Sequence, residues 1–391
     1  MNNKKEAQAN ISKEGISSRE YQDRLEKTRA AIADAGMVGL IAFGDCWRAA
    51  NVSYFTEFRP LDGISDIAMA LFILPVDGEP SLFVSEQTLG YAASVTDFSV
   101  HPFQDLTGAF KESARNLRYG SVELAGSAYI PATLMARLNE CLPKVRLEST
   151  SILAEIKAVK SAKELYLMQK AAELTDAAMA AIRDVLADGK SHSEHELARA
   201  ADVAMLAGGA ERTAYDSMVQ AGPRSVWNLA RPTDRILQPG DLVMTDIGAR
   251  YLGYVADGGR GFTYGPASPE KTAIIDAAAT AVEVGMSTAR PGMIASNLNA
   301  VIQQALIESG YEQYSDEARG HGTGHGTGMD PEEEAPWIGP GNQTVLKENM
   351  AFTLKATITV PGVGGLRTER IVRLNSSGCE ALDSFPMRLH W

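Results

Sequence analysis

The chain has 391 residues, 45% hydrophobic and 22% charged, so it is ordinary globular material long enough for two domains. Its formal net charge of −12 argues against binding to nucleic acid, which requires clustered lysine and arginine. Three widely spaced cysteines predict neither a disulfide framework nor a zinc site, which favours a reducing, cytoplasmic environment. No run of about 18 apolar residues occurs, so we expect no membrane partner.

The first half of the chain alternates predicted helices and strands. Residues 1–16 are polar and lack an apolar signal segment, so we interpret them as a disordered tail. A helix is expected to begin at Ser17, which has capping-box spacing to Glu20, and to stop at Gly36. Short apolar runs bounded by Gly, Pro and Asp predict strands at 38–43, 67–74 and 81–84. The pattern favours an α/β domain over 17–155.

A second domain is expected over 156–391. Ser161 and Glu164 again have capping-box spacing, and apolar residues recur at intervals of three and four from Leu165 to Leu186, which is typical of an amphipathic helix. Further helices are indicated at Ser193, Ser268 and Asn297. Alternating or β-branched runs predict strands at 242–248, 350–360 and 369–374.

Two aspartates in this second domain are the first candidates for chemistry. Asp246 and Asp257 stand eleven residues apart across a glycine-containing turn between two strand-like runs, so a hairpin would bring their carboxylates together. Aspartate is also common in turns, and this segment alone fits a structural role equally well.

Further polar residues stand in unusual surroundings. The segment RGHGTGHGTG (319–328) contains His321 and His325, two of the six histidines, among glycines that permit close backbone approach. Paired histidines beside polar residues favour a functional site over a satisfied core histidine. Glu369 heads a predicted apolar strand, where a buried carboxylate would need a cation, a metal ion or a proton.

Taken in order, four segments resemble the motifs of a known family. They are GPRSVWNLARPTDRILQPGDLV, DIGARYLGYVAD, HGTGHGTG and PGVGGLRTE, and they are similar to those of the pita-bread fold family of creatinase, prolidase, aminopeptidase P and ectoine hydrolase. The resemblance covers most of residues 155–391, and NVSYFTEF (51–58) resembles the family's N-terminal domain more loosely. It implies an α+β fold with a C-terminal pita-bread catalytic domain, a smaller N-terminal creatinase-like α/β domain and a homodimer.

The resemblance also raises the question of how many metal ions the site can hold. In the family's peptidases, two divalent ions are held by two Asp, one His and two Glu. Asp246, Asp257, His325 and Glu369 match four of these positions, but the family's MVFTIEPG reads MAFTLKAT here, which puts Lys355 in place of the fifth. A protonated ammonium cannot bind a cation. We therefore expect no metal cofactor, or at most one divalent ion on Asp257, His325 and Glu369.

Two further departures affect proton transfer. The family's SALPHARPTD reads SVWNLARPTD here, which leaves Leu229 in place of a histidine. A second family histidine, in GLDVHEAP, corresponds to Glu332 in GMDPEEEAP, which is one residue longer. Both changes argue against the usual peptidase mechanism.

The main functional prediction is a hydrolase of a C–N bond (amide, amidine or ureido) in a small nitrogen compound, similar to creatinase or ectoine hydrolase and without a dinuclear metal centre. A carboxylate would activate water or attack directly, His325 would transfer protons, and Lys355 would stabilise negative charge. The predicted catalytic set is His325, Glu369, Asp257, Asp246, Lys355 and His321.

Two alternatives remain open. One is a mononuclear metal-dependent peptidase of the Xaa-Pro type, or a lyase, and the other is a non-catalytic binding protein on a peptidase fold. The expected partner is a small-molecule substrate that carries a carboxylate. Predicted contacts with it come from Arg59, Trp47, Tyr54, Trp227, Glu332 and Arg367. Arg367 and Arg260 could instead neutralise the neighbouring carboxylates, and the tryptophans could be core residues.

Overall fold

The computed structural model describes residues 14–63, 65–108, 110, 117 and 119–389. Most of the predicted disordered tail therefore lies outside the described residues. The chain divides into two compact units, an N-terminal unit that ends at Lys157 and a C-terminal unit that begins at Ala158. The predicted domain boundary, between residues 155 and 156, lies two residues before the boundary that the structure shows.

The N-terminal unit is built on a six-stranded mixed sheet in the order β4-β3-β2-β1-β5-β6. Its strands are β1 (Gly39–Asp45), β2 (Met69–Pro75), β3 (Ser81–Val84), β4 (Ser99–Pro102), β5 (Gly120–Ala125) and β6 (Val145–Glu148). The β1–β2 and β2–β3 pairs are antiparallel, and the β1–β5, β3–β4 and β5–β6 pairs are parallel. The central strands read as continuous apolar runs because both of their faces are buried.

Helices of this unit begin and end where local chemistry dictates. The helices that the described residues form here are α2 (Ser18–Asp34), α3 (Ala50–Ser53), α4 (Leu89–Ser94), α6 (Ala132–Cys141) and α7 (Ile152–Ala158), the last of which ends at the boundary with the second unit. The Ser17 side chain caps α2 by accepting a hydrogen bond from the Glu20 amide, and Gly36 adopts a positive φ just after the helix. β2 begins two residues later than predicted, because residues 65–68 form a turn of 3₁₀ helix.

The C-terminal unit contains three antiparallel sheets, ordered β11-β10-β7, β12-β9-β8 and β14-β13-β15-β16-β17. The first two contain β7 (Arg212–Thr213), β8 (Met218–Ala221), β9 (Leu242–Ile247), β10 (Ala249–Tyr251), β11 (Tyr254–Val255) and β12 (Gly258–Thr263). The third contains β13 (Gly324–Gly326), β14 (Glu333–Ile338), β15 (Ala351–Val360), β16 (Gly364–Asn375) and β17 (Gly378–Ala381).

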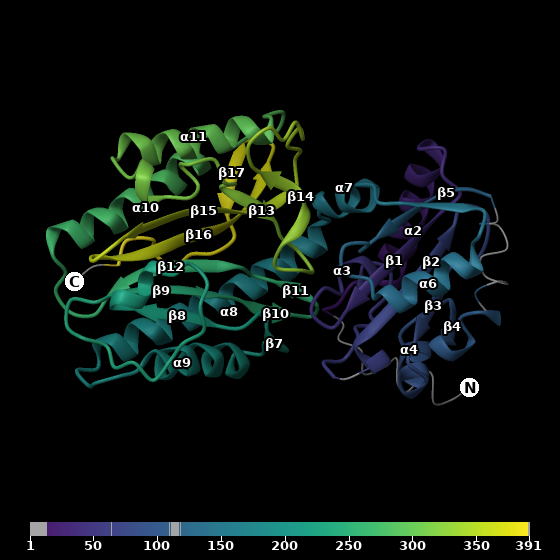
Figure 1. Ribbon diagram of the computed structural model, residues 1–391, viewed down its shortest axis with the longest axis horizontal. Coiled ribbons are helices and arrows are strands. Elements are labelled where there is room, and N and C mark those ends of the chain that lie inside the picture. The colour runs from purple at the N-terminus through teal and green to yellow at the C-terminus, as the bar shows by residue number, and fades with distance from the viewer. Residues whose placement is uncertain (1–13, 64, 109, 111–116, 118, 390–391) are drawn as a thin grey trace. The chain divides into compact units, whose positions relative to one another are not determined.

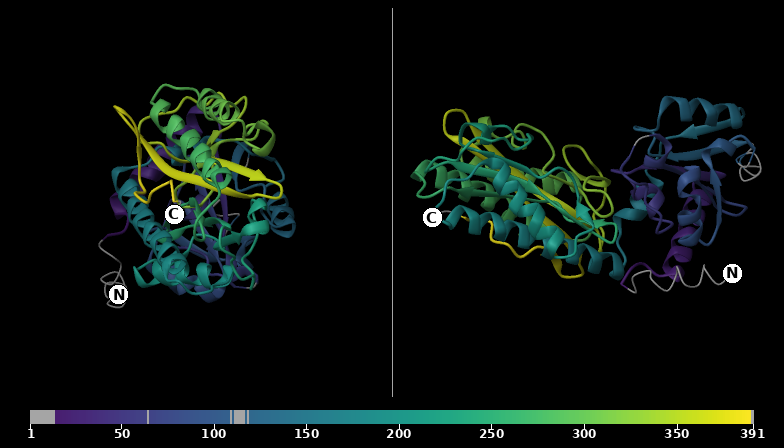
Figure 2. Two further views of the ribbon diagram at one scale, coloured as in Figure 1. Left: turned by 90° about the vertical axis from the view of Figure 1, so that its left-hand side faces the viewer. Right: turned by 90° about the horizontal axis from the view of Figure 1, so that it is seen from below.

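Helices cover both sides of these sheets. The unit has α8 (Ala162–Ala187), α9 (Glu194–Ala207), α10 (Pro269–Thr288) and α11 (Ala295–Glu308). In Figure 1, α10 and α11 lie above β15 and β16, whereas α8 and α9 lie below β8 and β9. Figure 2 shows the long strands β15 and β16, in yellow, running along the unit between these helix layers. No helix among the described residues is long and apolar enough to cross a membrane.

The helix starts follow the sequence signals with one exception. α8 and α9 both open with complete capping boxes, from Ser161 and Ser193. α11 begins at Ala295, two residues before the predicted Asn297, and its N-cap side chain makes no capping hydrogen bond. The backbone amide of Ala295 instead donates to the carbonyl of Thr344, and the next amide donates to that of Asn342. A neighbouring segment thus replaces the cap that the sequence lacks.

The prediction that Glu369 heads its strand is wrong. β16 begins at Gly364, so Glu369 lies in the middle of a strand that pairs with the whole length of β15. The two glycines before Leu366 lie in this strand and serve close packing. A Cβ on Gly365 would lie 2.7 Å from the Ser225 carbonyl oxygen, a separation too short for any side chain.

Candidate functional site

Strands of two contacting sheets in the C-terminal unit carry most of the predicted catalytic residues. His325 lies in β13, Lys355 in β15 and Glu369 in β16, while Asp246 lies in β9 of the other sheet. Asp257 occupies the short connection between β11 and β12. Lys355 and Glu369 are direct cross-strand partners, and His325 and Thr353 form another such pair. The two side chains of each pair therefore project from the same face of the sheet.

Glycines position His325. A Cβ on Gly324 would lie 2.1 Å from the carbonyl oxygen of Thr353, and a Cβ on Gly326 would lie 2.1 Å from that of Ala335. Neither position tolerates a side chain, so the glycines let β13 fit between β14 and β15. The glycine-rich motif therefore places an imidazole on a strand whose two flanking positions cannot carry a side chain.

Asp246, Asp257 and Glu369 form a buried carboxylate cluster. They are 3%, 4% and 0% exposed, and each offers an oxygen within 4.8 Å of the others. The Tyr215 hydroxyl lies 2.6 Å from Oδ1 of Asp246 and 2.5 Å from Oδ1 of Asp257. One hydroxyl carries one proton, so both short contacts are hydrogen bonds only when one of the two carboxyl groups is protonated.

Burial divides these acids into two kinds. Burial, reinforced by the negative charge of Glu369, raises the pKa of Asp246 and of Asp257 to about 8. Burial also acts to raise the pKa of Glu369, but the positive charges of Arg367 and Lys355 outweigh it and leave that pKa below its usual value. Glu369 is therefore the member of the cluster held as a carboxylate.

Arg367 lies inside the cluster. Its Nη2 is 2.6 Å from Oε1 of Glu369 and its Nε is 3.4 Å from Oδ2 of Asp246. The geometry of these contacts is that of ion pairs, without well-aligned hydrogen bonds between the groups. Nη1 donates a hydrogen bond to Oδ1 of Asn228 at 3.2 Å. Arg367 thus neutralises carboxylates, which is the second of the two roles considered for it.

His325 presents a lone pair to the cluster. Its Nδ1 lies 3.2 Å from the Gly326 carbonyl oxygen, which assigns the proton of the neutral ring to Nδ1. Nε2 lies 3.5 Å from Oδ2 of Asp257 and 3.6 Å from Oε1 of Glu332. Burial lowers the pKa of His325, and the positive charge of Lys355 acts in the same direction. The neutral ring is the form that binds metal ions.

The orphaned atoms of the site fit one divalent cation. Among the described residues, Nε2 of His325 and both carboxylate oxygens of Glu369 are buried without a hydrogen-bond partner, and of these two oxygens Oε1 is ion-paired with Arg367. Such atoms are rare in folded proteins and call for a missing ion or water. Imidazole nitrogen with carboxylate oxygen suits zinc, iron or manganese. The site contains three carboxylates and two cationic side chains. Its net negative charge is therefore closer to what one divalent ion neutralises than to what two would neutralise.

Two predicted residues of this unit lie apart from the cluster. His321 is exposed before β13, and within the described part of the chain it makes no hydrogen bond or ion pair with the carboxylates. Trp227 is 54% exposed, and the Arg224 guanidinium lies 4.9 Å from the centre of its ring. Trp227 directly precedes Asn228 in the chain, and only Asn228 of the two contacts Arg367 of the cluster among the described residues.

Tyr215 and Asn228 are the functional candidates that sequence reasoning missed. Asn228 stands in the motif SVWNLARPTD, beside the leucine that replaces a histidine, so its segment carried a signal. No local pattern marks Tyr215, which lies between β7 and β8 and reaches the aspartates because β7 pairs with β10 and β8 with β9.

The other predicted substrate contacts belong to the N-terminal unit. Tyr54 is 3% exposed, and the Arg24 guanidinium lies 4.4 Å from the centre of its ring, so its contacts are those of a core residue. Trp47 is 41% exposed, and its backbone amide donates to Oδ1 of Asp45. Burial raises the pKa of Glu57, and the positive charge of Arg59 partly offsets this increase.

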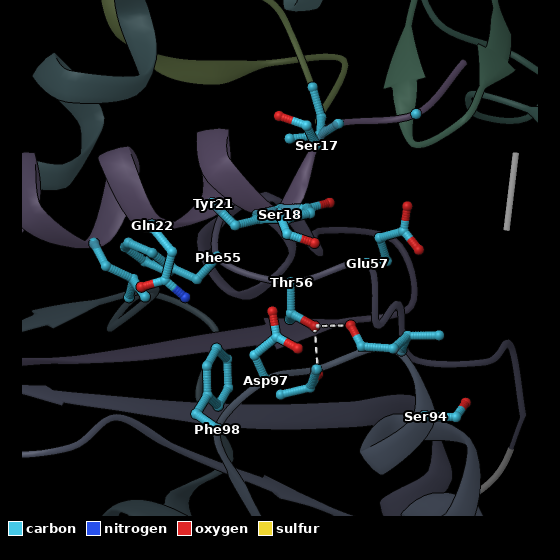
Figure 3. Close-up of a pocket in the computed structure, with 15 residues that line it drawn as sticks. Ser17, Ser18, Tyr21, Gln22, Phe55, Thr56, Glu57, Ser94, Asp97 and Phe98 are labelled. Atoms are coloured by element: carbon cyan, nitrogen blue, oxygen red, sulfur yellow. Dashed lines mark hydrogen bonds between the residues drawn. The ribbon is translucent and has the colours of Figure 1, made fainter. Parts of the chain in front are cut away.

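A cavity of about 370 Å³ opens in the same unit (Figure 3). Residues that line it include Ser17, Tyr21, Thr56, Glu57 and Asp97. Thr56 is fixed there by a 2.7 Å hydrogen bond between its hydroxyl and that of Thr96. None of the predicted site residues lines this cavity, so it is separate from the carboxylate cluster.

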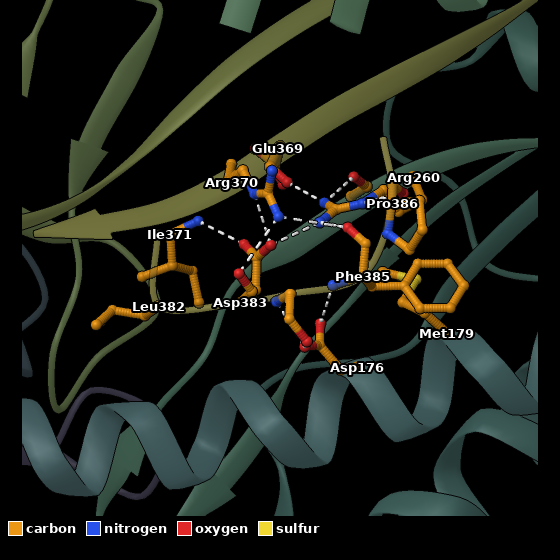
Figure 4. Close-up of polar contacts among 12 residues, drawn as sticks. Asp176, Met179, Arg260, Glu369, Arg370, Ile371, Leu382, Asp383, Phe385 and Pro386 are labelled. Atoms are coloured by element: carbon orange, nitrogen blue, oxygen red, sulfur yellow. Dashed lines mark hydrogen bonds and ion pairs between the residues drawn. The ribbon is translucent and has the colours of Figure 1, made fainter. Parts of the chain in front are cut away.

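Arg260 does not neutralise Asp257, contrary to the role considered for it. Its buried guanidinium binds Oδ1 of Asp383 at 2.8 Å and donates to the carbonyl oxygens of Phe385 and Pro386 at 2.9 and 3.1 Å (Figure 4). It also donates to the backbone carbonyl of Glu369. Arg260 thus attaches the segment 383–386 to the strand that carries a catalytic candidate.

Comparisons with known proteins agree with this architecture. The model of metallopeptidase family M24 matches residues 166–376. The chain is 26% identical to the Xaa-Pro dipeptidase of Pyrococcus horikoshii over 85% of this chain and 90% of that protein. It is 29% identical to the Xaa-Pro dipeptidase of Lactobacillus delbrueckii subsp. lactis over 84% of this chain and 89% of that protein. The structure of dipeptidase PepE from Mycobacterium ulcerans matches with a TM-score of 0.83 and 26% identity, covering 96% of this chain and 99% of that one. The predicted α+β pita-bread fold is confirmed.

Proposed function

The chain belongs to metallopeptidase family M24 and is a hydrolase of C–N bonds, and on this basis we propose that it cleaves the amide bond of a short peptide of the Xaa-Pro type with a single divalent metal ion. The dipeptidase relatives favour this alternative over the metal-free, creatinase-like hydrolase that the motifs alone favour. Hydrolysis of a C–N bond is common to both.

The observation that carries the proposal is the set of buried ligand atoms that accept no hydrogen bond, although Oε1 of Glu369 is ion-paired with Arg367. Tyr215 and Arg367 occupy the two oxygens of Asp246. Asp257 keeps Oδ2, and among the described residues the buried Nε2 of His325 and the Glu369 oxygens accept no hydrogen bond. These three residues would hold one ion, with Asp246 diverted to a supporting role.

When bound there, a divalent ion polarises the amide carbonyl and makes water a stronger acid. The protein supplies the rest. Lys355, which faces Glu369 across the strands, would stabilise the negative charge that develops on the amide oxygen. Arg367 holds Glu369, and Tyr215 holds Asp257, so the ligands are oriented before substrate binds. Leu229, 66% exposed, gives the substrate an apolar neighbour in place of a histidine.

Metal content and chelator sensitivity test the proposal together. The protein is purified without added metal, analysed by plasma mass spectrometry, and assayed on Xaa-Pro dipeptides before and after chelation. We expect about one ion per chain at saturation, loss of hydrolysis in chelator, and recovery with one equivalent of manganese, cobalt or zinc. Full activity in chelator would reject the metal-dependent mechanism.

One observation favours a second candidate, a metal-free hydrolase of a small carboxylate-bearing nitrogen compound. The charges of Arg367 and Lys355 already compensate Glu369, so this carboxylate is stable without an ion. In that reading Lys355 would also contact the substrate carboxylate. Screening small cyclic amides and guanidines in the presence of chelator separates the two candidates, because only the second retains turnover there.

Assembly and location are proposed from the family resemblance alone. We expect a cytoplasmic homodimer, in which Arg59 and Trp47 contact the substrate. Light scattering on the purified protein would test the dimer, and a monomer at all concentrations would reject it.

A further inference from the structure

Glu332 lies beside His325 at a distance that no hydrogen bond explains. Its Oε1 is 3.6 Å from Nε2 of His325, and Oδ2 of Asp257 is 3.5 Å from the same nitrogen. Both separations exceed the 2.7–3.2 Å or so of N–H···O hydrogen bonds. Donor atoms about 2.0–2.2 Å from a shared ion, at tetrahedral or octahedral angles, stand roughly 3.0–3.6 Å apart. Each of these two separations from Nε2 of His325 therefore matches that of neighbouring ligands of one ion.

We propose that Glu332 is a further ligand of the divalent cation, and that it supplies the carboxylate lost where Lys355 replaces a glutamate. The inference rests on the proposed one-ion function and specifies which side chains complete its site. It gives Glu332 a role different from the substrate contact predicted for it. The site would then join Glu332 from a loop to Asp257, His325 and Glu369 from strands and their connections.

The buried nitrogen of His325 is the independent sign of a ligand. The residue is 2% exposed, and Nε2 has no hydrogen-bond partner among the described residues. Its Nδ1 faces the Gly326 carbonyl, so Nε2 carries the lone pair. A lone pair that faces two carboxyl oxygens needs a proton or a cation between them.

The backbone that carries Glu332 is firmly held. The next residue, Glu333, forms a 2.7 Å ion pair with Lys160, and the two side chains are 3% and 1% exposed. The other oxygen of Glu333 accepts a hydrogen bond from the Met329 amide at 2.9 Å, and Arg250 donates to the Met329 carbonyl at 2.6 Å. The loop is fixed from inside, while the Glu332 side chain itself is 70% exposed.

This loop also leaves little freedom of placement. A Cβ on Gly328 would lie 2.7 Å from Oε1 of Glu333 and 2.8 Å from Nζ of Lys160, so the loop wraps closely around the buried ion pair. Glu333 points inward to that pair, and its neighbour Glu332 is left on the side of His325. The segment GMDPEEEAP thereby offers one glutamate to the core and the preceding one to the site.

Metal titration of the full-length, demetallated protein tests the assignment. Mn²⁺ and Co²⁺ affinities are measured by competition with a metal-sensitive indicator for the wild type, Glu332→Gln, Glu332→Asp and Glu334→Gln. Glu334 is an adjacent exposed carboxylate without a site contact among the described residues, so its variant is the matched control. We expect Glu332→Gln to weaken binding by at least the roughly 10- to 100-fold that loss of an outer-shell partner costs, and Glu334→Gln to leave it unchanged.

Two readouts separate coordination from a general effect of charge. The visible absorption of bound Co²⁺ should change in Glu332→Gln, because the ion loses an oxygen ligand. Glu332→Asp keeps the charge but shortens the side chain, so a ligand role predicts weakened binding and a pure field effect predicts none. Unchanged affinity and spectrum in Glu332→Gln would overturn the inference. Failure of the wild type to bind either ion would instead overturn the proposed one-ion function.

Discussion

Lys355 and Glu369 are direct partners across β15 and β16, so an ammonium and a carboxylate project from one face of the sheet. The family's motif places two carboxylates at these positions. Replacing one with a cation removes a ligand and adds a positive charge at the same point. The chain thus carries part of the site's positive charge as a side chain, and on the proposed function this would reduce the number of metal ions that the remaining carboxylates hold.

Restoring the carboxylate should restore a second ion. We expect Lys355→Glu to raise the metal content measured by plasma mass spectrometry from about one to about two ions per chain. Hydrolysis of the native substrate should fall, because the variant loses the ammonium that stabilises the developing negative charge. Lys355→Gln, which removes the charge without adding a ligand, is the control and should stay near one ion. An unchanged metal content in Lys355→Glu would show that Lys355 does not set the stoichiometry.

Removing the Tyr215 hydroxyl should loosen both aspartates. Tyr215→Phe removes the hydroxyl that contacts Oδ1 of both Asp246 and Asp257, so we expect the metal affinity to fall by roughly 10- to 100-fold. The matched control is Tyr264→Phe, which removes a hydroxyl that donates to the Lys190 carbonyl. Equal metal affinities in the two variants would argue against a role for Tyr215 at the centre.

The stability of the metal-free protein should depend on pH through the aspartate pair. Asp246 and Asp257 have pKa values raised from 3.8 to about 8 by burial and by Glu369, so the folded chain holds protons that the unfolded chain releases. Their contribution to stability is complete below pH 3.8 and is lost as the pH rises to about 8. The melting temperature of chelated protein should therefore fall from pH 6 to pH 8. The melting temperature of Asp257→Asn should fall less over the same range. If scanning calorimetry gives the same dependence of melting temperature on pH for the variant and the wild type, the assignment is contradicted.

The Arg260–Asp383 pair should contribute more to stability than an exposed ion pair does. Asp383 binds Arg260 at 2.8 Å and Arg370 at 2.7 Å, and it accepts a hydrogen bond from the Ile371 amide. Asp383→Asn leaves two largely buried guanidinium groups without their counter-charge, so we expect the free energy of unfolding in urea to fall by about 3–5 kcal/mol.

Asp184→Asn is the matched control for this change, because it breaks an exposed pair with Arg183. Surface pairs of this kind contribute about 0–1 kcal/mol. A similar loss of stability in both variants would mean that burial of the Arg260 pair has no special effect.

Sequence reasoning worked best where the cause is local. Ser161 and Ser193 announce their helices because the capping partner stands three residues away. The glycines beside His325 are informative for the same reason, since each excludes a side chain at a single point. The resemblance of ordered motifs adds what local patterns lack, because it joins Asp246 and Asp257 to His325 in one predicted site.

What sequence reasoning missed depends on contacts between distant segments. Tyr215 reaches Asp257 over 42 residues of chain, and Arg260 reaches Asp383 over 123. Neither partner can be chosen from spacing, because many tyrosines and aspartates fit equally well. The reason for a glycine at position 365 is also distant, since the Ser225 carbonyl that excludes a side chain there comes from another part of the fold.

The attachment of Arg260 also bears on how the protein folds during synthesis. Arg260 lies in β12, whereas Asp383 and the carbonyls of residues 385 and 386 follow every described helix and strand in the chain. On the ribosome, the guanidinium is made long before its partners emerge, and burying it unpaired would be costly. The sheets around β12 should therefore close only after residue 386 leaves the exit tunnel, when the N-terminal unit has long been free to fold.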